Sequence, residues 1–267
     1  MVNIEFCRYM FQAPPNKNVN GSRLVRVLSD LSASEPGIPD IEISHKQFAQ
    51  RLGLLVDLAD SVTLSESLRG LHRIAYEATS ISQTEVQQEF LKQRKAAIKA
   101  ITRSFEVRPG LVPFKLPIPK ADFTIEEASK FEPYQRFYTL HQSEIEFKTQ
   151  KLRTNIRQQI SGYSFGLAQL AELDQTLSKS MTLHTRKRFS VVPKLLKLRF
   201  EQLLKVHLQN VDVSEVEDHP VNWAKPGAWL SQFYEEMQQL LLAEVEIRMQ
   251  PALGLVEAFN EEVMKQA

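Results

Sequence analysis

The chain has 267 residues, of which 43% are hydrophobic, and its formal net charge is +1. This length can bury a substantial core, as one large domain or two small ones. The balanced charge excludes a global field that would draw the whole protein toward nucleic acid or an anionic membrane. The single cysteine, Cys7, excludes an intramolecular disulfide and fits a cytoplasmic location. Because no run of about 18 apolar residues occurs, we expect no membrane span.

The first part of the chain predicts a flexible N-terminus followed by short helices. Residues 1–20 include a polar, proline-rich stretch and are expected to be unstructured. Ser22 and Ser44 are placed to cap two helices, and a short helical piece is expected around residues 64–74. The first of these helices has an apolar stripe at i, i+3, i+4 and i+7 spacing, formed by Leu24, Val27, Leu28 and Leu31.

A longer helix is predicted to begin after Ser82 and to run to about Phe105. Ser82 and Glu85 have the S-x-x-E spacing of a capping box, in which each side chain satisfies a free backbone amide of the first turn. The expected inward face consists of Val86, Phe90, Ala97, Ile98 and Ile101.

Residues 106–123 interrupt the helical pattern. Four prolines in this segment exclude a regular helix interior, yet its other residues are largely apolar: EVRPGLVPFKLPIPKADF. We interpret it as an extended strap packed across the helices and as the boundary between two subdomains, with a docking segment for a partner as the alternative.

The remainder predicts long helices separated by short loops. Thr124 and Glu127 repeat the capping-box spacing, and Pro133 begins a helix that is expected to continue to about Ile160. Further helices are predicted over residues 165–189, with Leu167, Leu170, Leu173, Leu177 and Met181 inward, and over residues 193–209. The last long helix begins at Pro226, and Pro251 ends or kinks it before a terminal helix.

These elements predict an all-α protein, a multi-helix bundle with long antiparallel helices and a proline-rich extended strap. The predicted divisions are a flexible N-terminus (1–20), an N-terminal helical subdomain (21–105), the strap (106–123) and a long-helix C-terminal bundle (124–267).

One cluster of basic residues is a candidate anion or nucleic-acid site, because a helix face rich in Lys and Arg can bind phosphates. It comprises Arg186, Lys187, Arg188, Lys194, Lys197 and Arg199. Glutamates in the C-terminal stretch, among them Glu236, Glu244 and Glu257, offer an alternative, in which acidic and basic helices pair with each other and no partner is needed. A second basic face, which includes Lys92, Lys95 and Lys99, is open to the same two interpretations.

Other chemistry is poorly represented. His141 and Glu144 are spaced so that both could meet one metal ion, but the full ligand set of a di-iron bundle is absent. We recognise no catalytic motif and predict no catalytic residue, cofactor or metal, and if the protein were an enzyme, His141 would be the most plausible participant.

Three stretches carry a resemblance to a known family: residues 22–68, which contain SRLVRVLSDL and KQFAQRLGLLVDLADSVTLSESL; residues 131–160; and residues 188–259. Together they resemble a bacterial family of unknown function, number thirty-three forty-eight among such domains. The resemblance implies a gene neighbourhood with a stator-like membrane protein, similar to Zorya anti-phage systems, but no site residue.

Two functional interpretations follow. The first is a non-enzymatic helical accessory protein with a protein partner, for which the resemblance implies a membrane-anchored complex in phage defence. The alternative is a nucleic-acid-binding protein that uses residues 186–205.

Overall fold

The computed structural model describes residues 58–74, 76–79, 81–106, 112–210 and 218–266. The helices predicted after Ser22 and Ser44 lie outside the described residues, as does Cys7. Every regular element in the described part is helical, so the all-α prediction is confirmed.

The described chain begins with α4 (Leu58–Gly70) and the short 3-10 helix η1 (Leu71–Arg73). They are followed by α5 (Gln83–Ser104) and the single turn α6 (Ile125–Ala128). The long helices α7 (Glu132–Ser161) and α8 (Phe165–Phe189) come next, then α9 (Val192–Asn210). The 3-10 helix η2 (Pro220–Asn222) precedes the longest element, α10 (Trp229–Gln266).

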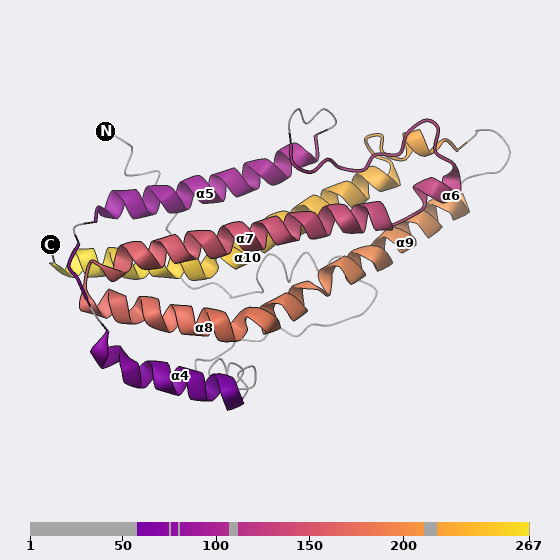
Figure 1. Cartoon of the computed structure of the whole chain (residues 1–267). Helices are drawn as coiled ribbons and strands as arrows, with labels where there is room; N and C mark the ends of the chain where they lie inside the picture. The colour runs from indigo at the N-terminus through magenta and orange to yellow at the C-terminus, as the bar shows by residue number, and fades with distance from the viewer. Residues whose placement is uncertain (1–57, 75, 80, 107–111, 211–217, 267) are drawn as a thin grey trace, which may run out of the picture.

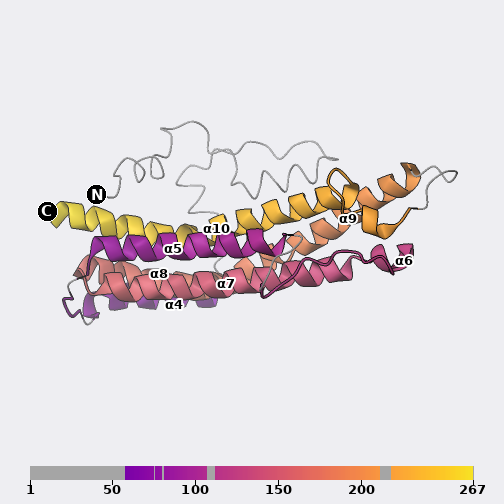
Figure 2. The ribbon, with the colours of Figure 1, turned by 90° about the horizontal axis from the view of Figure 1, so that it is seen from above.

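The helices form an elongated bundle in which α7 and α10 occupy the centre. They run in the same direction, while α5 on one side and α8 with α9 on the other run in the opposite direction (Figure 1). The shorter α4 packs on the outside of α8. The view from above shows two layers, one formed by α5 and α10 and the other by α7 and α8 (Figure 2). This arrangement confirms the predicted bundle of long helices with antiparallel neighbours, and α7 and α10 form a parallel pair within it.

A continuous apolar core joins the helices on both sides of the proline-rich segment. Val86 and Phe90 from α5 belong to the same buried cluster as Ile156 from α7 and Met237 and Phe259 from α10. Near the other end of the bundle, aromatic rings from α7, α9 and α10 pack edge to face or tilted, a geometry that the quadrupoles of aromatic rings favour. This aromatic group consists of Phe131, Tyr134, Phe200, Trp229 and Phe233.

The described part of the proline-rich segment contains no helix between Val112 and Phe123. The amide of buried Leu116 donates to the carbonyl of Ser104 at 3.3 Å, and the Tyr234 hydroxyl donates to the carbonyl of Pro117 at 3.0 Å. Residues 107–111 lie outside the described residues. The strap over its whole length, and the subdomain boundary there, therefore stay predictions.

One detail of the helix predictions is wrong. Ser82 is the N-cap of α5, but its hydroxyl makes no capping hydrogen bond, because the amides of Glu85 and Val86 bond to its backbone carbonyl instead. Thr124 and Glu127, by contrast, form the complete capping box that their spacing predicts. For Pro251 the sequence left an end and a kink of the helix open, and the end is excluded because α10 is continuous through Pro251. The helix changes direction part-way along its length (Figure 2).

Candidate interaction surface

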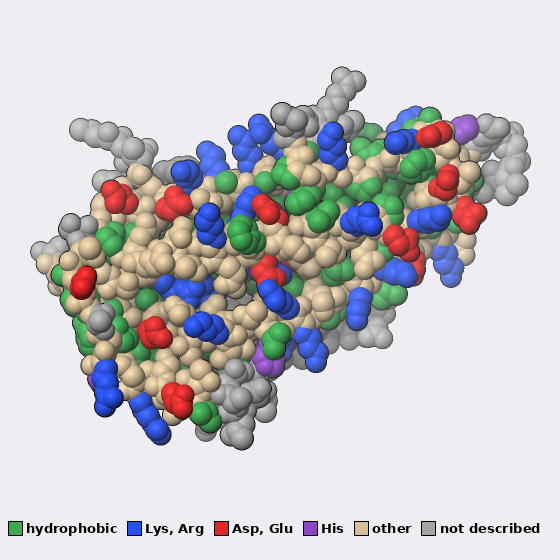
Figure 3. Space-filling view, in the orientation of Figure 1, with side chains coloured by type: hydrophobic (Ala, Val, Ile, Leu, Met, Phe, Trp, Pro, Cys, Tyr) green, Lys and Arg blue, Asp and Glu red, His purple; other side chains and the backbone are tan. Residues whose placement is uncertain are grey.

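The basic residues singled out in the sequence lie at the end of α8 and along α9. Lys187, Arg188, Lys194 and Lys197 are exposed. The space-filling view shows Lys and Arg side chains along the α9 side of the molecule, with acidic side chains among them (Figure 3).

Three of these six residues form ion pairs. The Arg199 guanidinium binds both carboxylate oxygens of Glu236 on α10, at 2.9 Å from Nε and 2.6 Å from Nη2. This bidentate geometry is the stronger kind of ion pair, and it raises the pKa of Arg199 through the hydrogen bond to Glu236. Arg186 Nε donates to Glu146 on α7 at 2.7 Å, and Lys197 lies 3.8 Å from Glu201 in an exposed pair that contributes little.

The basic and acidic helices therefore neutralise each other at one described contact, between Arg199 and Glu236. The acidic end of α10 lies at the opposite end of the bundle from α9, beside the start of α5 (Figure 1). There Gln83 and Gln87 donate to the side chain of Asn260. In the described part of the chain, Lys187, Arg188 and Lys194 form no ion pair and keep their charge available to a partner.

Apolar side chains lie between these free cations on the outer side of α8 and α9. We define the α8–α9 stripe as Leu183, Lys187, Val191, Lys194 and Leu198. All five are exposed, and Leu198 keeps 63% of its surface in contact with solvent. Leu183 and Lys187 are four residues apart on α8, and Lys194 and Leu198 are four residues apart on α9, so each pair lies on one helix face, while Val191 lies at the junction between the two helices. Apolar and basic side chains thus alternate along the stripe, a pattern that the positions of the charged residues alone do not reveal.

A chain of polar contacts connects this surface to the centre of the bundle. The fully buried carboxylate of Glu244 on α10 accepts hydrogen bonds from Tyr138 at 2.6 Å and Gln142 at 2.8 Å. Arg248 lies 3.5 Å from Glu244 and 3.7 Å from Glu146, which also binds Arg186 at the surface. Burial raises the pKa of Glu244, while its hydrogen bonds and Arg248 act in the opposite direction. The network holds α7 and α10 in one register.

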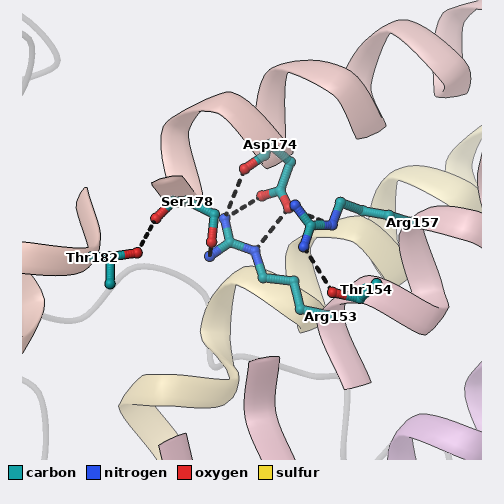
Figure 4. Close-up of polar contacts among 6 residues, drawn as sticks. All are labelled: Arg153, Thr154, Arg157, Asp174, Ser178 and Thr182. Carbon is teal, nitrogen blue, oxygen red and sulfur yellow. Dashed lines mark hydrogen bonds and ion pairs between the residues drawn. The ribbon is translucent and has the colours of Figure 1, made fainter. Parts of the chain in front are cut away.

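A second polar cluster joins α7 to α8. Arg153 and Arg157, one turn apart on α7, both point toward Asp174 on α8 (Figure 4). Arg153 binds both carboxylate oxygens of Asp174 and also donates to Ser178 at 3.3 Å. Arg157 lies 3.7 Å from the same carboxylate, and burial lowers its pKa. Two guanidinium groups thus share Asp174 as the carboxylate that balances their charge.

His141, the best sequence candidate for chemistry, is a buried residue. Its ring packs against Phe114 and Phe137, with centroids 5.1 and 4.7 Å away. Its Nε2 atom is buried and has no hydrogen-bond partner in the described structure, and burial lowers its pKa to about 4. Glu144, whose spacing would let it share a metal ion with His141, forms an ion pair with Lys148. Among the described residues, no three His, Cys, Asp or Glu side chains converge as metal ligands would.

One short pattern escaped the sequence analysis. Residues 162–166, Gly-Tyr-Ser-Phe-Gly, have the G-x-S-x-G spacing of a nucleophile elbow. A nucleophile elbow requires a strand before the serine, whereas here the pentapeptide joins α7 to α8. Ser164 is the N-cap of α8 and accepts a hydrogen bond from the Leu167 amide at 3.2 Å. The serine therefore has a structural role that accounts for it.

Comparison with known proteins gives the family. None of the described helices is long and apolar enough to cross a membrane. No curated protein and no solved structure matches the chain. A family model described as "Protein of unknown function (DUF3348)" matches residues 10–261, which is most of the sequence. This agrees with the resemblance found in the sequence, and the chain belongs to the DUF3348 family.

Proposed function

We propose that this protein is a non-enzymatic interaction protein that docks through the α8–α9 stripe on an acidic surface of a protein partner. The observation that carries the proposal is the alternation of exposed Leu183, Val191 and Leu198 with the unpaired cations Lys187 and Lys194. Apolar side chains supply the buried centre of a protein interface, and the surrounding cations select an acidic partner.

The resemblance described above supports a more specific partner. It suggests a stator-like membrane complex, beside which this protein would act as an accessory component in phage defence. In that case the membrane-anchored protein supplies the acidic surface, and this chain binds it by protein contacts rather than by spanning the bilayer.

The test is affinity purification from native cells with two charge-reversed variants. The α8–α9 variant is Lys187→Glu/Lys194→Glu/Lys197→Glu, which reverses both cations of the stripe and the adjacent Lys197. The α5 variant is Lys92→Glu/Lys95→Glu/Lys99→Glu, which makes the same three changes at exposed positions of α5. We expect the wild type and the α5 variant to recover the same membrane-anchored protein, and the α8–α9 variant to lose it. Recovery of that protein by all three, or by none, would contradict the proposal.

Nucleic-acid binding is the second candidate function, and the unpaired Lys187, Arg188 and Lys194 favour it. It predicts that the binding constant for a DNA or RNA duplex falls steeply with salt, because each phosphate contact releases counterions. The α8–α9 variant should lose this binding, while the α5 variant keeps it. Absence of binding to either duplex at low salt would exclude nucleic-acid binding, and it would not affect the proposed docking on a protein partner.

A further inference from the structure

A groove lies on the face of the molecule shown in Figure 3, between the proline-rich segment and the beginning of α7. Its volume is 660 Å³, within the range of about 300–1,000 Å³ that is typical of ligand sites. Phe114 forms part of one wall, and Phe137 and Leu140 belong to the helix opposite. Hydrophobic side chains gather in this part of the surface (Figure 3).

The walls of the groove are fixed by contacts beneath it. The ring of Phe137 packs edge to face against Phe105 at 5.2 Å and against His141 at 4.7 Å. On the other wall, Phe114 contacts the same His141 ring, and the Tyr234 hydroxyl binds the carbonyl of Pro117. Because both walls are already packed in the free protein, a ligand would not have to order them when it binds.

A second exposed apolar side chain lies further along α7, beyond the polar residues Ser143 and Glu144. Leu140 and Phe147 are seven residues apart, so they lie on one face of the helix, about 10 Å apart along its axis. Phe147 keeps 65% of its surface exposed. An enclosed pocket would suit a compact small molecule, whereas an open groove with an exposed phenylalanine further along the same helix face suits an elongated chain.

The charges around the groove define the partner further. Three of its lining residues, Lys115, Lys130 and Arg136, are exposed cations, and within the described part of the chain none of them forms an ion pair. Glu132 is the one acidic residue among the lining residues of the described groove. This excess of positive charge favours an acidic segment and disfavours a basic one.

We infer that this groove binds a short acidic segment of a partner protein, which inserts a large apolar side chain between Phe114 and Leu140. Carboxylates beside that side chain face Lys115 on one wall and Arg136 on the other. The groove is formed by different elements from the α8–α9 stripe, so it is a second docking site and does not depend on the function proposed above.

The test is a selection of random dodecapeptides against the full-length protein, followed by fluorescence anisotropy with the enriched peptides. We expect sequences that combine Asp or Glu with Phe, Leu, Ile or Trp. The variant Arg136→Glu/Leu140→Asp should weaken their binding at least about tenfold, as truncation of central contacts does. The matched control Arg69→Glu/Leu68→Asp makes the same changes at exposed positions of α4, and it should bind as the wild type does.

Thermal unfolding confirms that each variant is folded, and Lys115→Glu on the opposite wall provides a second test of the site. The inference is overturned if no peptide is enriched, or if the enriched peptides bind the groove variant as tightly as the wild type. Loss of binding in Lys187→Glu/Lys194→Glu/Lys197→Glu but not in the groove variant would assign the peptides to the α8–α9 stripe, and it would equally overturn the inference. Binding of laurate at the groove without any peptide binding would identify a small amphiphile as the ligand instead.

Discussion

Replacing Asp174 with alanine should destabilise the fold far more than removal of an ordinary surface charge. Asp174 is the acceptor for Arg153 and the neighbour of Arg157, and the three side chains are only 11–15% exposed. Removing it leaves two guanidinium groups between α7 and α8 without the carboxylate that both of them contact. Breaking a buried pair from one side costs about 3–5 kcal/mol, mainly because the remaining charge stays poorly solvated.

The measurement is urea unfolding followed by far-UV circular dichroism. We expect Asp174→Ala to lower the free energy of unfolding by about 3 kcal/mol or more, and to lower the melting temperature by roughly 6–12 °C for a chain of this size. The control is Glu144→Ala, because Glu144 and Lys148 form an ion pair whose partners are both 40% exposed. That change should cost less than about 1 kcal/mol.

A compensating variant tests the reason for the loss. In Asp174→Leu/Arg153→Met/Arg157→Met all three charges are replaced by apolar groups, so most of the lost stability should return. Equal destabilisation by Asp174→Ala and Glu144→Ala would refute the reasoning, and so would a triple variant that is no more stable than Asp174→Ala.

Three further predictions concern other positions. Gly162→Ala should lower the free energy of unfolding by about 1–3 kcal/mol, since its Cβ would clash with the Oγ1 atom of Thr79, and Thr79→Gly should restore stability in a thermal melt. The His141 pKa is lowered from 6.5 to about 4, so the unfolded chain binds the extra proton first, and stability should decrease by roughly 3 kcal/mol as the pH falls through that interval. Urea unfolding of His141→Leu should show a weaker pH dependence, and an unchanged slope would contradict this. Glu244→Ala should cost about 3–5 kcal/mol in urea unfolding, because Arg248 and Tyr138 lose a buried acceptor, whereas Glu244→Leu/Arg248→Met should recover part of it.

The sequence predicted the long helices because local signals mark their ends. Pro133 and Gly162 bracket α7, whose predicted and observed bounds differ by one residue at each end. The inward face predicted for α8 was less accurate: Leu167 is buried, but Leu170, Leu173, Leu177 and Met181 are only half-buried. Hydrophobic spacing identifies which face of a helix is apolar, but it does not tell how much of that face other helices cover. Since α8 lies toward the edge of the bundle, its apolar face remains partly open.

The polar contacts between helices could not be predicted from the sequence, for a different reason. Tyr138 and Glu244 meet from positions 106 residues apart, and nothing in local periodicity specifies such a pair. The same limit applies to the candidate surface. The sequence identified the basic residues of α8 and α9. Only the packing shows that Arg199 forms an ion pair with Glu236, whereas Lys194 forms none among the described residues.

The central position of α10 has a consequence for how the protein folds during synthesis. This helix contributes more of the buried core than any other described element, yet it is the last of them to leave the ribosome. Until it emerges, the faces of α5 and α7 that pack on α10 in the folded protein lack that partner. The nascent chain therefore exposes part of its apolar core surface until α10 is made, a state that favours association with chaperones or with other chains.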